Sequence, residues 1–356
     1  MFNQFVGVKP VEERHRFDVS ALENYIRPHI DGLKGPLVVE QFKGGQSNLT
    51  YRLSAGGRRY VLRRKPPGKL LPSAHAVDRE FRVIRALHGA GFPVARPYVL
   101  CEDDAVIGTA FYVMDCVEGR VLWDQSLPGM TKAERRAIWE ELNRVIALLH
   151  TIDYKALGLE SFGKAGSYLE RQIGRWSTQY QASKTIKIEP MDNLIAWLPK
   201  NIPAGDETAI VHGDFRLDNT IFHQSEPKVL AVLDWELSTL GHPLADFSYH
   251  CMSWHIAPGK FRGIEGLPLQ ELGIPGEREY IEMYCRRTGR KGIDPSTWDF
   301  YMAYNLFRIA AITQGIAKRV LDGTAASAYA ADAGARAPLL AELGWKQVEK
   351  ILKRAA

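Results

Sequence analysis

The stretch Ile-Val-His-Gly-Asp-Phe-Arg-Leu-Asp-Asn-Thr-Ile-Phe-His (residues 210–223), followed by a polar turn and Val-Leu-Ala-Val-Leu-Asp-Trp (229–235), predicts a β-hairpin. Residues 220–223 and 229–233 are short apolar runs, and the segment between them, Gln-Ser-Glu-Pro-Lys, is typical of a turn. Asn219 and Asp234 are about equally distant from the middle of this turn, so strands in register would place them opposite each other. Asp214 lies five residues before Asn219. Two carboxylates and an amide are therefore expected to converge at the open end of the hairpin.

The side chains in this stretch suit phosphoryl transfer. Asn219 and Asp234 offer the hard oxygen ligands that Mg²⁺ prefers, and Asp214 is then available to orient or deprotonate a hydroxyl. The spacing from His212 through Asp214 to Asn219 matches the catalytic loop of kinases, with Asp234 at the place of the metal-binding Asp. The alternative is a surface hairpin with ordinary turn acids. Three such residues at this spacing, flanked by apolar strands, disfavour that alternative.

Length and composition indicate an ordinary globular protein. The 356 residues are 46% hydrophobic and 24% charged, which allows one large domain or two lobes. No apolar run is long enough to span a membrane, and the N-terminus lacks the features of a signal peptide. Four scattered cysteines predict free thiols in a reducing compartment. We therefore expect a cytoplasmic protein without a membrane partner.

The positive charge of the chain is concentrated in its first third. The net charge is +5, and residues 1–120 hold 18 Lys and Arg against 13 Asp and Glu. The basic cluster is made up of Arg58, Arg59, Arg63, Arg64, Lys65 and Lys69. It lacks the interleaved aromatic residues of a nucleic-acid surface, so we expect no nucleic-acid partner. A surface that faces phosphates explains the cluster with fewer assumptions.

Residues 37–65 predict three strands that would cover a nucleotide. Strands at 37–42 and 49–53 flank a turn whose backbone N–H groups are expected to bind phosphates, although such turns also join ordinary hairpins. The turn residues are Gly44, Gly45, Gln46, Ser47 and Asn48. The third strand, at 59–63, ends where kinases carry a phosphate-binding Lys, and here Arg63 takes that position. Arg64 in this role and a solvated basic edge strand are the alternatives.

The segment that follows predicts the rest of an N-terminal lobe. A helix at 76–87 carries Glu80, which is the candidate partner of the basic residue, ahead of Asp78 or a plain solvated acid. Strands at 98–101 and 110–114 complete five antiparallel strands, preceded by an irregular leader (1–17) and a helix capped by Asp18. Adenine is expected on the backbone near Met114, Asp115 and Val117. Met114 could equally belong to the core.

The remainder of the chain is predicted to be helical. Helices are expected at 131–150, 166–181, 192–198, 280–284, 301–320 and 345–352, with a loop at 258–276. The segment 158–165 imitates a phosphate-binding P-loop, but it ends in Ala165 and follows a helix, so we reject it. The segment 241–246 resembles the part of small-molecule kinases that follows the metal-binding Asp, and this resemblance implies that Asp246 braces the catalytic loop. The candidates for the acceptor side are Arg171, Arg175, His242, Trp254 and Arg308.

These motifs resemble the aminoglycoside phosphotransferase and choline kinase superfamily, from the glycine turn to the helix near residue 301. Leu-Arg-Arg-Lys-Pro-Pro-Gly (62–68), Phe-Gly (162–163), Arg-Gln (171–172) and Leu-Asp-Trp-Glu (233–236) resemble one branch, which includes the kinase-like domain fused to some acyl-CoA dehydrogenases. The resemblance implies an α+β, two-lobed protein-kinase-like fold, with lobes at 1–118 and 119–356. It also implies ATP and Mg²⁺ as cofactors, Asp214 as catalytic residue, and Asn219 and Asp234 as metal ligands.

The resemblance implies a kinase that phosphorylates the hydroxyl of a small molecule. The arginines of the acceptor candidates favour an anionic acceptor, and the dehydrogenase branch suggests a hydroxy acid or a hydroxyacyl-CoA. An aminoglycoside or amino-alcohol kinase is the alternative acceptor class. A nucleotide-binding pseudokinase and a metal-dependent hydrolase that uses His212, Asp214 and Asp234 are rivals from other classes. ATP and GTP are not distinguished by the sequence, and neither is the oligomeric state.

Overall fold

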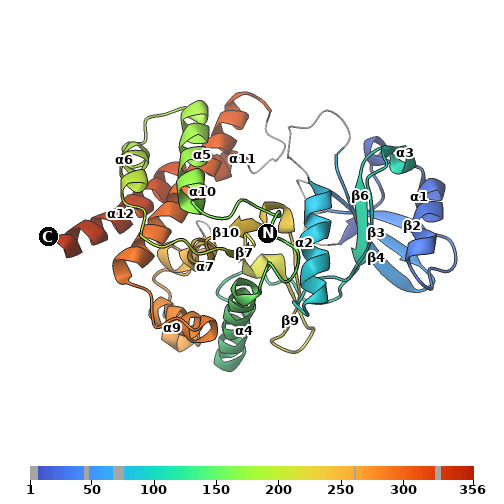
Figure 1. Ribbon diagram of the computed structural model, residues 1–356, viewed down its shortest axis with the longest axis horizontal. Helices are drawn as coiled ribbons and strands as arrows, with labels where there is room; N and C mark the ends of the chain where they lie inside the picture. Colours follow the sequence, from blue (N-terminus) through green and yellow to red (C-terminus); the bar gives the residue numbers. More distant parts are fainter. Residues whose placement is uncertain (1–6, 44–47, 67–75, 260–261, 325–329) are drawn as a thin grey trace. The chain divides into compact units, whose positions relative to one another are not determined.

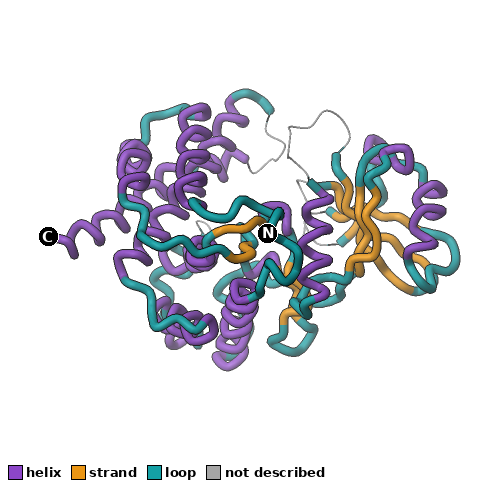
Figure 2. The backbone as a smooth tube through the Cα atoms, viewed as in Figure 1, coloured by secondary structure: helices purple, strands orange, loops and turns teal. Residues whose placement is uncertain are grey.

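The computed structural model (Figure 1) describes residues 7–43, 48–66, 76–259, 262–324 and 330–356. The chain forms two compact units, of which the first contains Met1–Trp123, Lys155–Phe162 and Asp218–Ser238, and the second contains Asp124–Tyr154, Gly163–Leu217 and Thr239–Ala356. The first unit holds the large sheet, and the second is mostly helical (Figure 2). The predicted hairpin belongs to the first unit, whereas the sequence analysis expected it in the lobe 119–356.

The sheet of the first unit is antiparallel and has the strand order β1-β2-β3-β4-β6-β5. Its strands are β1 (Val8–Lys9), β2 (Val38–Phe42), β3 (Leu49–Ala55), β4 (Arg58–Arg64), β5 (Pro97–Cys101) and β6 (Phe111–Asp115). The five predicted strands are β2 to β6. The leader is not wholly irregular, because Val8 pairs with Phe42 and adds β1 at the edge. Two residues are too short for an alternating pattern to reveal a strand.

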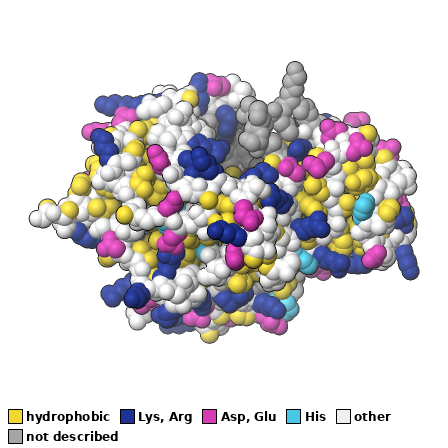
Figure 3. Space-filling view, viewed as in Figure 1, with side chains coloured by type: hydrophobic (Ala, Val, Ile, Leu, Met, Phe, Trp, Pro, Cys, Tyr) yellow, Lys and Arg dark blue, Asp and Glu magenta, His cyan; other side chains and the backbone are white. Residues whose placement is uncertain are grey.

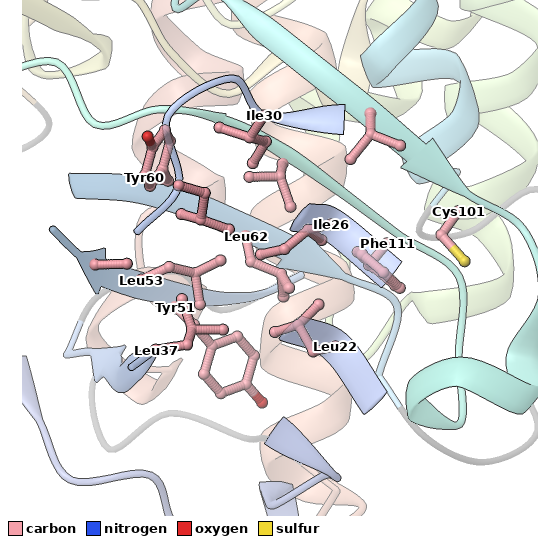
Figure 4. Packing of buried hydrophobic residues seen from close by; sticks show 14 of the residues in the cluster. Leu22, Ile26, Ile30, Leu37, Tyr51, Leu53, Tyr60, Leu62, Cys101 and Phe111 are labelled. Atoms are coloured by element: carbon pink, nitrogen blue, oxygen red, sulfur yellow. The ribbon is translucent and has the colours of Figure 1, made fainter. Parts of the chain in front are cut away.

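One face of the sheet is covered by α1 (Val19–Ile26) and the short α3 (Asp104–Ile107) (Figure 1). Asp18 caps α1 by accepting the backbone N–H groups of residues 20 and 21, as the sequence predicted. Leu22 and Ile26, one turn apart on α1, are fully buried and lie over Leu53 and Leu62 (Figure 4). Burial of each such side chain contributes about 1.5–3 kcal/mol, so this core anchors the sheet.

The opposite face of the sheet carries α2 (Val77–Gly89) (Figure 1). Phe81 on α2 packs against Tyr112 on β6, with ring centroids 6.0 Å apart. Val77 and Ile84 share this buried helical face with Phe81. The packing brings Glu80, in the first turns of α2, against the sheet.

The predicted hairpin is present as β8 (Thr220–Phe222) and β9 (Val229–Val232). Thr220 pairs with Val232, and the register shifts by one residue before Phe222. The backbone N–H of Leu233 donates to the carbonyl of Asn219 at 2.8 Å. Asn219 therefore lies opposite Leu233, and the expectation that it faces Asp234 directly was wrong by one residue. Phe222 pairs with Val229 beside the turn, so an unshifted ladder would place Asn219 opposite Val232, and the bulge moves it to Leu233, nearer to the expected partner.

The second unit is built from helices around a small two-stranded sheet, β7 (Ala209–Val211) and β10 (Thr239–Gly241). Its helices are α4 (Lys132–Thr151), α5 (Tyr168–Ser183), α6 (Glu189–Trp197), α7 (Pro243–His250), α8 (Leu269–Leu272), α9 (Glu277–Thr288), α10 (Pro295–Leu321), α11 (Ala330–Gly334) and α12 (Ala337–Ala355). Thr131 begins α4 with a capping box to Glu134. The segment 258–276 is not all loop, because it contains α8.

The surface in view in Figure 3 carries Lys and Arg side chains interspersed with Asp and Glu. Within the described residues, no helix combines the length and apolar character needed to cross a membrane. All four cysteines are free thiols, as the sequence predicted.

Two buried histidines allow a prediction of how the stability of the folded protein depends on pH. Burial lowers the pKa of His250 and of His242 to about 4, whereas a histidine in the unfolded chain titrates near 6.5. The unfolded state therefore binds more protons between these values, so stability is complete above about pH 6.5 and falls as the pH drops toward 4. The loss amounts to roughly 3 kcal/mol per histidine. We expect the thermal midpoint to fall over this range.

The His250→Gln variant tests the cause of this loss. Its thermal midpoint should depend less steeply on pH between 6.5 and 4 than that of the unmodified protein. His223→Gln, at a half-exposed position in the turn of the hairpin, is the matched control and should keep the full slope. Equal slopes for all three proteins would contradict the prediction.

Candidate active site

A buried ion pair stands at the centre of the first unit. The Nε of Arg63, on β4, lies 3.1 Å from Oε2 of Glu80 on α2. Glu80 is 1% exposed and accepts further hydrogen bonds from Nδ2 of Asn48 at 2.6 Å and from the hydroxyl of Tyr112 at 2.9 Å. The carboxylate is thus held from three directions. It fixes the direction of the guanidinium, because a buried charge is stable only when it is paired and hydrogen-bonded.

The electrostatics of this pair keep Arg63 positively charged. Burial lowers the pKa of Arg63, but the surrounding Tyr112, Glu80 and Asp234 raise it more, so that the net pKa lies above its ordinary value. Burial raises the pKa of Glu80, while Arg63 and the hydrogen bonds oppose that rise. A second carboxylate, that of Asp234, lies 3.4 Å from Nη2 of Arg63. One cation therefore connects the α2 carboxylate with the end of the hairpin.

Arg64 points away from this cluster. Its Nε donates to the hydroxyl of Thr109 at 3.0 Å, and its guanidinium lies over the ring of Phe17, 5.3 Å from the centroid. Successive side chains of a strand point to opposite faces of the sheet, so only one of the two arginines can face the hairpin. The geometry assigns that place to Arg63.

Asp234 follows β9 in an unusual backbone conformation. Its φ is +65°, in the left-handed region that side chains other than Gly, Asn and Asp rarely adopt. The next residue, Trp235, begins the short helix η6 (Trp235–Leu237), and its indole donates to the carbonyl of Val232 at 2.9 Å. Trp235 also packs edge-on against Phe92, with centroids 5.8 Å apart. These contacts hold the chain in a sharp turn that directs the Asp234 carboxylate toward Arg63.

Asn48, Arg63 and Asp234 line a cavity of about 490 Å³ in the first unit. The apolar lining comprises Phe42, Val61, Ala95, Met114, Val117, Val121, Trp123, Ile221 and Leu233. The polar lining comprises Asn48, Thr50, Arg63, Asp115, Asp218, Asn219 and Asp234. Apolar walls with a few convergent polar groups, at this volume, are typical of sites for small ligands and cofactors.

The predicted hinge forms one wall of this cavity. Met114, Asp115 and Val117 all line it. Gly119, two residues further on, lies so close to β8 that a Cβ there would be 2.2 Å from the carbonyl oxygen of Phe222. Only glycine allows the hinge to approach the hairpin this closely. Of the predicted turn residues, Asn48 is at the cavity, and Gly44, Gly45, Gln46 and Ser47 lie outside the described residues.

The donor atoms at the hairpin end fit a magnesium ion that completes its shell elsewhere. Asn219 and Asp234 line the same cavity and supply an amide and a carboxylate oxygen. In the described part of the chain, no three His, Cys, Asp or Glu side chains come close enough together to hold a metal. Mg²⁺ commonly takes one or two protein oxygens together with water and substrate phosphate. The residues present fit an ion bound in this shared way.

The second unit holds the loop 212–214 in place from two helices. Asp246, on α7, accepts the backbone N–H groups of His212 and Gly213 at 2.7 and 2.8 Å, and His150 on α4 lies 3.2 Å from the same carboxyl group. Burial alone would raise the pKa of Asp246. The interaction with His150 and the backbone hydrogen bond from His212 lower the pKa by more than burial raises it, so the net pKa is below its usual value. Arg308 on α10 donates to the carbonyl of Gly213 at 2.8 Å. The predicted bracing role of Asp246 is confirmed.

The Asp214 carboxylate lies beside a tyrosine and two cations. Tyr249 donates its hydroxyl hydrogen bond to Oδ1, and Nη2 of Arg216 lies 3.0 Å from Oδ2. Burial, and then the charge of Asp214, raise the pKa of Tyr249, so it stays a protonated donor. Arg308 stacks over the Tyr249 ring, 5.2 Å from its centroid. A small cavity of about 20 Å³ adjoins this group and is lined by Arg216, Tyr249 and Arg262, among others.

A comparison with protein families adds the decisive observation. The model of the phosphotransferase enzyme family, abbreviated APH, matches residues 38–311, which is most of the chain. The chain belongs to the phosphotransferase enzyme family. The match begins at β2 and ends within α10, so it includes the Arg63–Glu80 pair, the hairpin and the loop that carries Asp214.

Solved structures agree with this family and with the protein-kinase-like fold. A Ralstonia eutropha protein, provisionally named an aminoglycoside phosphotransferase, is 58% identical and has a TM-score of 0.87 over 94% of this chain and 99% of that one. The choline kinase of Cryptosporidium parvum has a TM-score of 0.66 over 95% of this chain and 97% of that one. Its identity is 13%, so the likeness is one of fold.

Curated relatives place the phosphotransferase in the branch that the motifs resembled. Acyl-CoA dehydrogenase family member 10 of Mus musculus is 46% identical over 343 residues. The match covers 95% of this chain but only 32% of that protein. The phosphotransferase therefore spans about a third of the length of this relative.

The predicted acceptor residues divide into two groups. Arg308 contacts Tyr249 and Gly213 and so belongs to the Asp214 site, whereas Arg171 donates to the carbonyls of residues 164 and 166 and closes a loop. Arg175 lies over the ring of Trp176 on the same helix. His242 caps α7 and bonds to Tyr301, and Trp254 is buried with its indole donating to the carbonyl of residue 275. We do not retain these last two in the proposed acceptor surface.

Sequence reasoning did not assign several residues that contribute to the site. Tyr112 orients Glu80, Arg216 contacts Asp214, and Asp218 lines the cavity beside Asn219. Tyr112 lies in an unbroken apolar run and therefore resembles a core residue. Asp218 and Arg216 lie inside the catalytic motif, and their closeness to it was the one available signal.

Proposed function

We propose that this phosphotransferase moves the γ-phosphoryl group of ATP to a hydroxyl of a small molecule. The observation that carries this proposal is the arrangement in the first unit. An arginine held by a buried glutamate lies beside Asn219 and Asp234, in a cavity large enough for a nucleotide. Family membership supports the same reaction class.

Arg63 is proposed to hold the nucleotide phosphates, with Glu80 fixing its direction. Its planar guanidinium can bind two phosphate oxygens at once. Met114, Asp115 and Val117 would receive the adenine. Asn219 and Asp234 would hold Mg²⁺, which when bound neutralises charge on the phosphates.

Asp214 is proposed as the residue that receives the proton of the acceptor. The acceptor oxygen forms a bond to the γ-phosphorus, the bond from that phosphorus to the bridging oxygen of ADP breaks, and the hydroxyl proton passes to the Asp214 carboxylate. Tyr249 and Arg216 orient that carboxylate. Because Asn219 follows Asp214 by five positions in the chain, their Cα atoms cannot lie more than about 18 Å apart.

The proposed acceptor is an anionic alcohol, either a hydroxy acid or a hydroxyacyl-CoA. Arg216 and Arg308 lie around Asp214, and Arg262 lines the adjoining small cavity. Cations at these positions attract a carboxylate or phosphate and repel a polycationic aminoglycoside. The names of the curated relatives point to acyl-CoA chemistry as well.

An aminoglycoside or amino-alcohol kinase is the second candidate, and the name of the Ralstonia eutropha protein favours it. A pseudokinase is disfavoured because the proposed base and both proposed metal ligands are present. A hydrolase that uses His212 as a metal ligand has less support, since His212 is fully buried and its Nδ1 accepts the backbone N–H of Asp214.

The proposal is tested by phosphoryl transfer from γ-labelled ATP with Mg²⁺ to two separate pools of acceptors. One pool contains hydroxy acids and hydroxyacyl-CoAs, and the other contains aminoglycosides and amino alcohols. We expect label in the first pool. Label in the second pool alone would overturn the acceptor class, and binding of ATP without label in either pool would favour the pseudokinase.

A further inference from the structure

Helix α2, which carries Glu80, is tied to the segment that imitates a P-loop in sequence. Arg82 donates to the carbonyl of Gly158 and to the hydroxyl of Ser161, both at 2.8 Å. Arg79 donates to the carbonyl of Phe162 at 2.7 Å and lies over its ring, 4.6 Å from the centroid. We call residues 158–162 the strap. It lies in the first unit although the chain reaches it between α4 and α5.

Arg79 makes one further contact, and this contact leads to the hairpin. The same guanidinium nitrogen lies 3.5 Å from the carbonyl oxygen of Ser238. Ser238 directly follows η6, the short helix that begins after Asp234. One side chain thus connects α2, the strap and the segment that ends the Asp234 turn.

The other end of α2 is also attached to the hairpin. The backbone N–H of Val232 donates to the carbonyl of Pro93 at 2.8 Å, and Trp235 packs against Phe92. Phe92 and Pro93 follow the C-terminal end of α2. At the beginning of α2, the N-cap residue Ala76 offers no capping hydrogen bond from its side chain, so the side chains of the first turns attach this end of the helix.

We propose that Arg79 is a positioning residue for the nucleotide site. It holds the first turns of α2 against the strap and against Ser238, and thereby keeps Glu80 and Arg63 in place relative to Asp234 before any nucleotide binds. The inference rests on the proposed function and assigns to this helix a fixed position. In protein kinases the position of the corresponding helix controls whether the Lys–Glu pair is in place.

The geometry explains why this work falls to an arginine. A guanidinium offers several N–H donors in one plane and can stack on an aromatic ring through its face. The edge of the Arg79 guanidinium reaches the backbone carbonyls of Phe162 and Ser238, while its face covers the ring of Phe162. Methionine can keep part of the packing on Phe162 but offers no hydrogen-bond donor to either carbonyl.

The first experiment measures binding of Mg·ATP by calorimetry to the full chain with Arg79→Met. We expect affinity about tenfold weaker than that of the unmodified protein, with a thermal midpoint that changes by only a few degrees. Arg85→Met, on the exposed side of the same helix, is the matched control and should bind normally. Unchanged affinity of the Arg79→Met protein would overturn the inference.

A double-mutant cycle separates positioning from general destabilisation. If Arg79 acts through Glu80, Arg79→Met should add little to the binding loss already caused by Glu80→Gln, because residues that act as one unit give non-additive effects. Fully additive losses would overturn the inference, since they would show that the two residues act separately.

Hydrogen exchange of backbone amides in the nucleotide-free protein tests the positioning role of Arg79 without relying on the proposed activity. Arg79→Met should raise exchange of backbone amides in 77–84 and 235–238, and Arg85→Met should not. Failure of the unmodified protein to bind Mg·ATP would refute the proposed function, and exchange would then decide the role of Arg79 alone. Unchanged exchange in both segments would overturn it.

Discussion

Replacing Asp214 with asparagine is expected to slow phosphoryl transfer by about 10²–10⁴, the range typical of a lost general base. Asparagine has nearly the shape of aspartate and can still accept a hydrogen bond from Tyr249, but it cannot take up the proton of the acceptor. The residues proposed to bind nucleotide belong to the first unit, and Asp214 belongs to the second. Affinity for Mg·ATP should therefore stay unchanged.

Steady-state rates and Mg·ATP calorimetry on the same preparation check this expectation. Tyr249→Phe is an informative companion, because it keeps the carboxylate and removes only one hydrogen bond to it. Its rate should fall far less than that of Asp214→Asn, by about tenfold for the loss of roughly 1.5 kcal/mol. Normal turnover by Asp214→Asn would show that another group receives the proton.

Replacing Asp234 with asparagine is expected to weaken the dependence of nucleotide binding on Mg²⁺ and to weaken Mg·ATP binding by about 10–100-fold, because an amide oxygen is a poorer ligand than a carboxylate. Asparagine is preferable to alanine here, because it tolerates the left-handed backbone conformation that Asp234 adopts. The variant thus removes the charge of the proposed metal ligand with little backbone strain.

Calorimetry with and without Mg²⁺ measures this effect, and the thermal midpoint in the absence of ligand serves as the control for folding. Arg63 would lose one of its two carboxylate partners, whereas its interaction with Glu80 at 3.1 Å would remain. Equal affinity for Mg·ATP in the variant and the unmodified protein would exclude Asp234 as a ligand.

Much of the fold and part of the candidate site could be predicted because the signals are local. The hairpin, the α2 periodicity and the cap at Asp18 each follow from residues within one or two turns of each other. The sequence named Glu80 ahead of Asp78, and the structure shows that Glu80, but not Asp78, is buried on α2. The structure pairs Arg63 with Glu80, as the sequence led us to expect.

The features that sequence did not reveal depend on long-range packing. Tyr112 meets Glu80 from 32 residues away, and Arg79 meets Ser238 from 159 residues away. The position of the tight turn and the bulge beside it set the pairing of the hairpin, and no spacing rule locates either of them. The strap is part of the segment 158–165 that imitates a P-loop in sequence, but its contacts with α2 involve side chains that otherwise resemble ordinary surface arginines.

The arginine at position 63 also determines whether chemical probes that label phosphate-binding lysines can detect this protein in a cell extract. Reagents that detect nucleotide sites by acylating a phosphate-binding lysine require an uncharged nitrogen as nucleophile. The Arg63 guanidinium has a pKa above its ordinary value and a side chain only 14% exposed. It offers no such nucleophile at neutral pH. In a lysine-directed chemical screen, the absence of a label at position 63 is therefore what a nucleotide-binding chain of this kind should give.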